Sequence, residues 1–308
     1  SIASWQRIKV LFEAYHDLEQ DEGLDTDDVK GNIEFRDVQF NYPDATVPTL
    51  EHLNINIKAG TKVAIVGRTG SGKSTLVQLL PRLFEPTKGE IFLDGIPLKN
   101  YSKRSLRDAL GFVPQDHFLF SDTIEENIGF GIKGATTQDV EWAAEKAQVL
   151  DNILDFDKKF QTILGEKGIT LSGGQKQRTA IARALIKKPK ILILDDSLSA
   201  VDTKTEDAIL KSLRNDETKV TVIIISHRIS TIKDADYIYY IEDGKVKEAG
   251  THEELLSQKE SYKSMYDKQL IEQEAANKGQ KPQQLGIKQK DLHRLSQVVN
   301  QMHHLHHL

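Results

Sequence analysis

The sequence predicts an α/β fold with a largely parallel sheet. Short apolar runs occur at 62–66, 190–194 and 220–225, each about as long as a strand that is buried on both faces. A segment whose apolar residues have helical spacing, near 203–214, separates the last two runs. Strands that alternate with helices are typical of parallel sheets, because each helix returns the chain to the same edge of the sheet.

Three other segments complete the expected architecture. Residues 31–60 alternate apolar and polar side chains, which predicts antiparallel strands. Residues 122–160 carry apolar residues at helical spacing, and another helix is expected over 74–83. Thr251 and Glu254 have the spacing of a capping box, which predicts a helix from about residue 252.

Composition excludes several classes of protein. The 308 residues have room for one large domain or two ordinary ones, and the net charge of −5 shows no basic excess that would indicate nucleic acid. The absence of cysteine excludes disulfides, thiolate metal sites and cysteine nucleophiles. No apolar run approaches the roughly 18 residues that a membrane-spanning helix needs.

A glycine-rich segment, Gly67–Ser74, reads GRTGSGKS and matches the pattern G-x-x-x-x-G-K-[ST] in full. It joins a predicted strand to a predicted helix, as this pattern requires. Glycines allow positive φ angles, so the backbone N–H groups can point at a phosphate at close range. Lys73 would place a charge near the β- and γ-phosphates, and the Ser74 hydroxyl suits Mg²⁺. The segment predicts a nucleotide site but does not separate an ATPase from a GTPase or a small-molecule kinase.

Asp195 ends the apolar run that begins at Ile191. A buried carboxylate is costly without a partner, and Mg²⁺ would supply one. The sequence therefore predicts that Asp195 is a metal ligand.

The segment Leu171–Gln175 reads LSGGQ. Ser172 can donate its hydroxyl, and Gly173 and Gly174 expose backbone N–H groups where a helix begins, so the segment predicts a second anion site. Together with the upstream glycine loop, it resembles the signature of the nucleotide-binding domain of an ATP-binding cassette (ABC) protein. The resemblance covers roughly residues 31–265.

The resemblance implies a P-loop core with an antiparallel β subdomain and a helical subdomain over about 116–172. It implies ATP and Mg²⁺ as cofactors and a second nucleotide-binding domain as partner. In the family, the signature closes over the γ-phosphate of an ATP held mainly by the partner, so two domains dimerise head to tail around two ATP molecules. Gly165–Gly168 resembles a motif that is typical of exporters.

Further residues take roles from the resemblance alone. Tyr42 resembles the aromatic residue that stacks on adenine, with a core tyrosine as the alternative. Gln115 resembles the glutamine that contacts Mg²⁺ and the attacking water and senses the transmembrane domain. His227 resembles the switch histidine at the γ-phosphate, with a structural histidine as the alternative. Ser199–Asp202 resembles the loop through which two nucleotide domains signal to each other.

The complete set of predicted site residues follows from these motifs. The catalytic residues are Asp196, His227 and Gln115, the metal ligands are Ser74, Gln115 and Asp195, and the nucleotide contacts are Tyr42, Gly67, Arg68, Thr69, Gly70, Ser71, Gly72, Lys73, Ser74, Thr75, Asp195, Ser172, Gly173, Gly174, Gln175 and Asp202.

Asp196 departs from the family pattern, in which a glutamate follows the strand-ending aspartate as general base or water-orienting group. The aspartate carboxylate sits back by roughly 1.5 Å, and a misplacement of about 1 Å can lower a rate about a hundredfold. Ser197 and Leu198 also replace the usual proline–threonine pair. The combination resembles one half of the heterodimeric bacterial multidrug exporters, where one ATP site is degenerate. The alternative is an aspartate that is tolerated in a homodimer.

Three segments are expected along the chain. Residues 1–30 resemble the end of a transmembrane helix followed by an acidic linker. Residues 31–270 form the nucleotide-binding domain, and residues 271–308 form a polar connector with a short amphipathic helix and a histidine-rich, tag-like end.

The function expected from the resemblance is that of an ATP-hydrolysing motor at the cytoplasmic face of the cell membrane. It would drive the transmembrane domains of an exporter, with no nucleic-acid partner. One alternative is a regulatory nucleotide-binding half with little hydrolysis of its own, which Asp196 favours. Another is a soluble ABC ATPase of DNA repair or translation, and the exporter-like motif Gly165–Gly168 argues against it.

Overall fold

A computed structural model describes residues 21–116, 118–166, 168–214 and 219–279. The chain divides into two compact units after Ala249. Residues 1–20 of the predicted segment 1–30, and residues 280–308 of the predicted segment 271–308, lie outside the described residues. Within the described residues, no helix is long and apolar enough to span a membrane.

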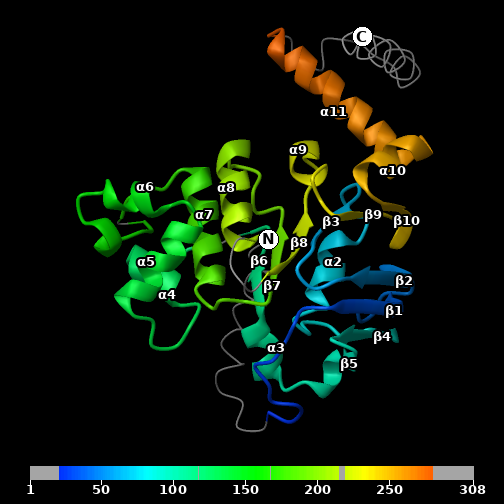
Figure 1. Cartoon of the computed structure of the whole chain (residues 1–308), viewed down its shortest axis with the longest axis horizontal. Coiled ribbons are helices and arrows are strands. Elements are labelled where there is room, and N and C mark those ends of the chain that lie inside the picture. The colour runs from blue at the N-terminus through cyan, green and yellow to red at the C-terminus, as the bar shows by residue number, and fades with distance from the viewer. Residues whose placement is uncertain (1–20, 117, 167, 215–218, 280–308) are drawn as a thin grey trace. The chain divides into compact units, whose positions relative to one another are not determined.

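The first unit contains a six-stranded sheet in the order β10-β9-β3-β8-β7-β6 (Figure 1). Strand β3 pairs in parallel with β8 and β9, and β7 pairs in parallel with β6 and β8. The strands are β3 (Lys62–Val66), β6 (Leu110–Val113), β7 (Ile191–Asp195), β8 (Thr221–Ile225), β9 (Tyr237–Glu242) and β10 (Lys245–Gly250). This arrangement confirms the predicted parallel sheet and places the carboxyl ends of β3, β6, β7 and β8 at one edge.

Alternate residues of the parallel strands belong to different apolar cores. Ile191 and Ile193 of β7 belong to one buried cluster, whereas Leu192 and Leu194 belong to the other. Successive side chains of a strand point to opposite faces, so both faces of the sheet are covered. Continuous apolar runs rather than alternating ones are the sequence pattern that this double burial requires.

A second sheet has four strands in the order β2-β1-β4-β5. Strand β1 pairs antiparallel with both β2 and β4, and β4 pairs antiparallel with β5. The strands are β1 (Ile33–Phe40), β2 (Leu50–Ile57), β4 (Lys88–Leu93) and β5 (Ile96–Pro97). The antiparallel strands predicted from the alternation over 31–60 are present.

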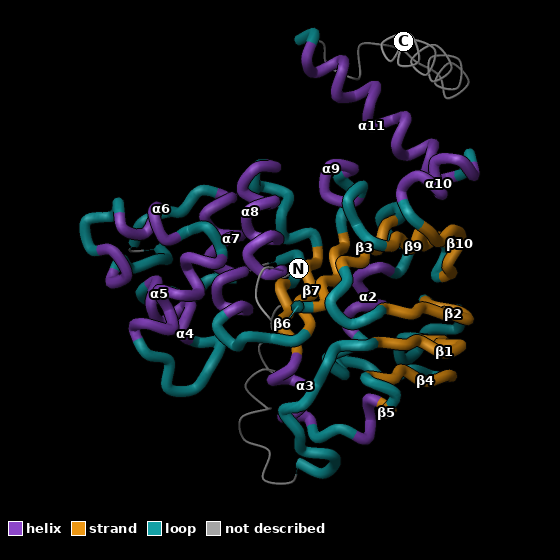
Figure 2. The backbone as a smooth tube through the Cα atoms, in the orientation of Figure 1, coloured by secondary structure: helices purple, strands orange, loops and turns teal. Residues whose placement is uncertain are grey.

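Helices and short helical turns connect the strands of the first unit, as the purple segments of Figure 2 show. They are α2 (Lys73–Gln78), η1 (Leu98–Asn100), α3 (Lys103–Ala109), α4 (Ile124–Gly129), α5 (Thr137–Lys146), α6 (Leu150–Leu154), η2 (Lys159–Gln161), α7 (Gly173–Leu185), α8 (Thr203–Arg214) and α9 (Ile229–Ile232). Helices α4 and α5 pack against α7, and α5 also contacts α8. The helical segment expected over 122–160 is therefore built around the helix that begins at the signature.

Helix α2 is shorter than the helix that the sequence predicts over 74–83. It ends at Gln78, and Arg82 has a φ of 59° in the left-handed region. Pro81 accounts for the early end, because proline disfavours helical geometry in the residue before it and cannot donate a backbone hydrogen bond.

The second unit contains α10 (His252–Gln258) and α11 (Ser261–Asn277). The Thr251 side chain accepts a hydrogen bond from the Glu254 N–H, which confirms the predicted helix start. Helix α11 continues to Asn277, so the first residues of the predicted polar connector are helical. The division into 31–270 and 271–308 stays a prediction.

Candidate functional site

The glycine segment leaves the end of β3 and enters α2. Gly67, Gly70 and Gly72 have φ angles of 155°, 81° and 105°, a region that favours glycine. A Cβ atom at Gly67 would collide with the backbone carbonyl oxygen of Ile241 in β9. The loop therefore needs glycine both for its backbone geometry and for its close approach to the neighbouring strand.

Lys73 lies over this loop rather than in open solvent. Its Nζ atom donates to the backbone oxygens of Gly67, at 2.5 Å, and of Arg68, at 3.0 Å. Burial lowers the pKa of Lys73, while the charges of Asp195 and Asp196 act in the opposite direction. The ammonium group is thus held where the carbonyls and carboxylates of the site converge.

Asp195 ends β7 and is 4% exposed. The Ser74 hydroxyl donates to its Oδ1 atom at 3.4 Å. Burial raises the pKa of Asp195 to about 6, and Asp196 adds to this rise, while the bond from Ser74 and the charge of Lys73 oppose it. A carboxylate and a hydroxyl in contact form an oxygen donor set of the kind that Mg²⁺ prefers, so these residues fit the predicted metal.

Asp196 and His227 follow adjacent strands and come close together. His227 Nδ1 lies 3.8 Å from Asp196 Oδ1, and the two side chains are 71% and 20% exposed, respectively. The Asp196 N–H donates to the Ile225 carbonyl oxygen at 2.9 Å, which ties it to the end of β8. Asp196 has a φ of 50°, a conformation that aspartate tolerates better than most residues.

Gln115 and Tyr42 each lie two residues past the end of a strand, β6 and β1 respectively. Gln115 lies at the sheet edge that carries Asp195, and its side chain is exposed. The Tyr42 hydroxyl is 2.8 Å from the Thr75 hydroxyl of α2, and its half-buried ring packs edge-on against Phe40 and Phe84. Tyr42 is therefore anchored to the helix that follows the glycine loop. Its contact with adenine stays a prediction.

The signature forms the start of α7. The Ser172 hydroxyl accepts from the Gln175 N–H at 3.2 Å, and the Gln175 side chain accepts from the Ser172 N–H at 3.0 Å. This capping box leaves the Ser172 hydroxyl hydrogen available to a ligand. Gly173 and Gly174 occupy the first helical turn, where N–H groups have no intrahelical acceptor. The segment has the geometry of the predicted anion site, at a helix start distinct from the glycine loop.

Asp202 has a different role within this structure. Its carboxylate accepts from the Thr205 N–H and hydroxyl, both at 2.8 Å, at the start of α8. These hydrogen bonds, first of all the one from the Thr205 backbone, lower the pKa of Asp202. The predicted contact between Asp202 and a nucleotide stays a prediction, and within the chain the residue caps a helix.

Three residues that were not predicted surround the loop Ser199–Asp202. They are Gln177 on α7, Glu206 on α8 and Arg228 directly after His227. Glu206 is 1% exposed and Gln177 is 4% exposed, although both are polar. A sequence signal did exist, because Glu206 shares the apolar face of its helix with Ile209, Leu210 and Leu213.

Comparison with known proteins places this site in a family. A family model described as ABC transporter matches residues 50–199. An ABC transporter ATP-binding protein of Bacillus subtilis, YfiB, which is described as uncharacterized, is 44% identical over 87% of the chain and 46% of its own length. An ATP-dependent lipid A-core flippase of Hahella chejuensis is 44% identical over 84% of the chain and 44% of its own length.

A solved structure agrees with these relatives. A bacterial Atm1-family ABC exporter with ATP bound matches with a TM-score of 0.75 and 41% identity, over 82% of this chain and 44% of its own. The chain thus spans less than half the length of each of these proteins. The glycine loop, Asp195 and the whole of the signature helix α7 lie within the matched family region. The chain carries the ATP-binding domain of the ABC transporter family.

Proposed function

We propose that this chain binds and hydrolyses ATP to power efflux by an ABC exporter, and that it works as a head-to-tail dimer around two Mg-ATP molecules. The observation that supports the proposal is that one chain has two separate segments whose backbone geometry suits a phosphate group. The glycine loop at 67–75 lies with Asp195, whereas the signature starts α7. A head-to-tail pair would bring the signature of each chain to the nucleotide held by the other.

The roles of the side chains follow from their positions. Lys73 would balance phosphate charge, and Tyr42 would border the base next to α2. Ser74, Asp195 and Gln115 would hold Mg²⁺, which would neutralise charge on the phosphate oxygens. Asp196 and His227, 3.8 Å apart, would orient the attacking water and contact the γ-phosphate.

The proposed setting is the cytoplasmic face of a membrane, with transmembrane domains as the second partner. A pocket next to Gln115 supports this part of the proposal. It combines exposed aromatic surface at Phe130 with basic side chains, and it is lined by Arg107, Phe112, Pro114, Phe130, Gly131, Arg183, Ala184 and Lys187. Because Pro114 directly precedes Gln115, a segment bound here would be adjacent to the predicted water-contacting residue.

We further propose that the ATP site of this chain turns over slowly and that the chain pairs with a half carrying a glutamate. Asp196 supports the idea, since its short carboxylate also sits on a left-handed backbone that is tied to β8. The intact signature of this chain would then complete the faster site on the partner. A regulatory half with little hydrolysis is the second candidate, and the same residue favours it.

The test compares Mg-ATP hydrolysis by the wild type and by Asp196→Glu in the intact exporter, alone and with any half-transporter encoded beside it. We expect the variant without a partner to turn over roughly ten to a hundred times faster than the wild type, because the longer side chain reaches the water. Asp151→Glu, on an exposed position of α6, makes the same chemical change away from the site and is the control. Equal rates for wild type and Asp196→Glu would show that the aspartate is a working catalytic group and that a homodimer suffices.

A further inference from the structure

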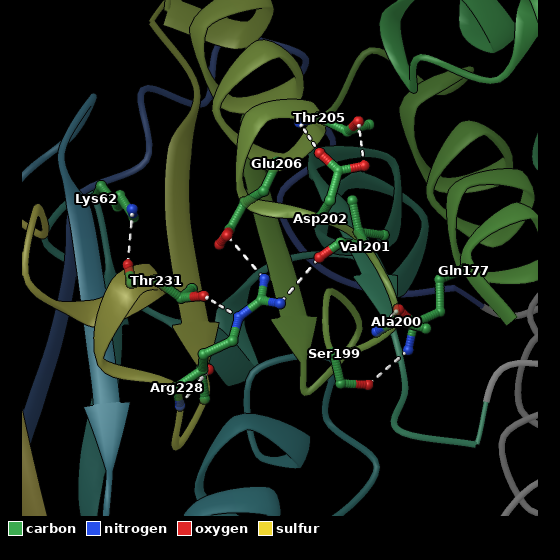
Figure 3. A network of polar contacts seen from close by, with 11 residues as sticks. Lys62, Gln177, Ser199, Ala200, Val201, Asp202, Thr205, Glu206, Arg228 and Thr231 are labelled. Carbon is green, nitrogen blue, oxygen red and sulfur yellow. Dashed lines mark hydrogen bonds and ion pairs between the residues drawn. The ribbon is translucent and has the colours of Figure 1, made fainter. Parts of the chain in front are cut away.

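The loop Ser199–Asp202 is held from two sides by side chains of other segments (Figure 3). On one side, Gln177 of α7 donates to the Ser199 hydroxyl and accepts from the Ala200 N–H, both at 2.8 Å. On the other side, Arg228 donates from Nη1 to the Val201 carbonyl oxygen at 2.9 Å. The loop therefore bridges the helix of the signature and the segment of His227.

Arg228 is itself fixed in position. Its Nη2 atom donates to Glu206 at 2.8 Å, and its Nε atom donates to the Thr231 hydroxyl at 3.1 Å. The Glu206 side chain is 1% exposed and the Arg228 side chain is 31% exposed, so the carboxylate end of the pair is buried while the guanidinium end is half-buried. Loss of Arg228 would be destabilising, because it would leave the buried Glu206 carboxylate without its partner. The guanidinium group thus has one preferred position, with its fork directed at the loop.

Lys62 joins the same network through Thr231. Its Nζ atom donates to the Thr231 backbone oxygen at 3.0 Å. Burial lowers the pKa of Lys62, and the charge of Glu206 is the largest opposing influence. The backbone oxygen and the side-chain hydroxyl of Thr231 thus both accept hydrogen bonds, from Lys62 and Arg228 respectively. These bonds restrain the short helix α9, which follows His227.

The start of α7 also touches the loop directly. A Cβ atom at Gly174 would lie 2.8 Å from the Ala200 carbonyl oxygen, and one at Gly173 would lie 3.3 Å from the Ala200 Cβ atom. Any displacement of the signature must therefore move Ala200 or open a gap against it. Ala200 is therefore held both by its contact with the start of α7 and by the hydrogen bond that its N–H donates to Gln177.

We propose that Gln177 and Arg228 are positioning residues that couple the signature of this chain to its own His227 through the loop Ser199–Val201. This proposal rests on the function proposed above, in which the signature contacts the partner's ATP while His227 contacts the chain's own ATP. Binding at one site would then move the loop and shift His227 at the other. Neither residue lies in the set predicted to contact nucleotide.

The experiment is a double-mutant cycle in the intact exporter. Gln177→Met removes both hydrogen bonds at similar volume, and Arg228→Lys keeps the charge but removes the forked geometry. We expect each single variant to lower kcat by roughly 3- to 30-fold, the range that corresponds to coupling through a contact network. The double variant should stay within about twofold of the worse single variant, because both changes interrupt one route.

Nucleotide affinity separates a positioning role from a general loss of structure. Binding of a fluorescent ATP analogue to the purified chain should stay within about twofold of wild type for both variants, since neither residue is predicted to contact nucleotide. The Hill coefficient for ATP in the intact exporter should fall toward one. Thr179→Val is the matched control on α7, because it removes the hydrogen bond to the Gln175 backbone oxygen without touching the loop.

The outcomes are distinguishable. Multiplicative losses in the double variant, or a kcat loss in Thr179→Val as large as in Gln177→Met, would overturn the coupling. If Arg228→Lys does not fold, Thr231→Val replaces it in the cycle, because it removes the hydrogen bond that holds the Arg228 Nε atom and keeps the side-chain volume. If the wild-type exporter hydrolyses no ATP, the proposed function fails. If it hydrolyses ATP and the variants match it, only the coupling fails.

Discussion

The two glycine-containing segments of this chain need glycine for different reasons. In the loop at 67–72, all three glycines have φ angles between 81° and 155°, so the backbone itself requires them. In the signature, Gly173 and Gly174 lie in the first turn of α7, where alanine would have an ordinary backbone conformation. There, glycine is required because Ala200 of another loop lies against the helix start.

The geometry of the two segments is therefore determined in different ways. The first segment carries its own geometry, and its supporting contacts come from the strands around it. The second has its geometry set by a loop that also contacts Arg228, beside His227. A change in the first should weaken nucleotide binding by the single chain, whereas a change in the second should spare binding and affect the assembled exporter.

The largest expected effect is that of Lys73→Met. This change removes the charge that lies over the glycine loop, so hydrolysis by the intact exporter should fall by at least about a hundredfold. Binding of ATP by the purified chain should weaken as well, and both can be measured on the same preparation. Lys99→Met, which breaks only an exposed ion pair with Glu90, is the control. If Lys73→Met hydrolysed ATP at a rate within tenfold of wild type, the proposed role of Lys73 would be contradicted.

Substitutions in the signature should lower hydrolysis less than Lys73→Met does, and the loss should differ between its two glycines. Gly174→Ala places a methyl group against a carbonyl oxygen at 2.8 Å and should lower hydrolysis by the exporter by roughly tenfold to a hundredfold, because the helix start or the loop must move to relieve the contact. Gly173→Ala meets only a methyl group at 3.3 Å and should cost less.

The signature variants should differ from variants of the glycine loop in how well the single chain binds ATP. Both signature variants should bind ATP as the wild-type chain does, because the glycine loop is unchanged. A loss of single-chain affinity in Gly174→Ala, or a larger effect for Gly173→Ala, would show that the close approach of Ala200 does not govern this segment.

The sequence predicted the parts of the molecule that depend on local patterns. The apolar runs at β3, β7 and β8 predicted the parallel sheet, because a strand covered on both faces must be apolar throughout. Asp196 and His227, which the resemblance assigns to one catalytic site, lie 3.8 Å apart because they follow neighbouring strands. The spacing of apolar residues did not predict the early end of α2, which Pro81 causes although the helical spacing continues beyond it.

The supporting contacts of the site were less accessible to prediction. Gln177 and Arg228 lie far apart in sequence and meet through the backbone of a third segment. Such contacts depend on the tertiary placement of backbone oxygens and N–H groups, which carry no side-chain signature. Glu206 was the exception, because a carboxylate on the apolar face of α8 indicates a buried partner.

The smallest expected effect separates backbone strain from function in the first segment. Gly70 and Gly134 have φ angles of 81° and 70°, and a Cβ atom at either position would have nothing within 4 Å. Replacement of either by alanine should therefore lower the free energy of unfolding by about 1–2 kcal/mol, from the left-handed conformation alone. Urea unfolding of the purified chain measures this cost.

The two variants should differ in nucleotide binding. Gly70→Ala places a methyl group beside the proposed phosphate position and disturbs the loop, so it should weaken ATP binding, whereas Gly134→Ala, between α4 and α5, should not. Equal affinities would mean that Gly70 serves the fold of the loop alone and that phosphate is held by the rest of the segment. Because both changes carry the same strain, a difference in affinity would measure what the position of Gly70 contributes beyond stability.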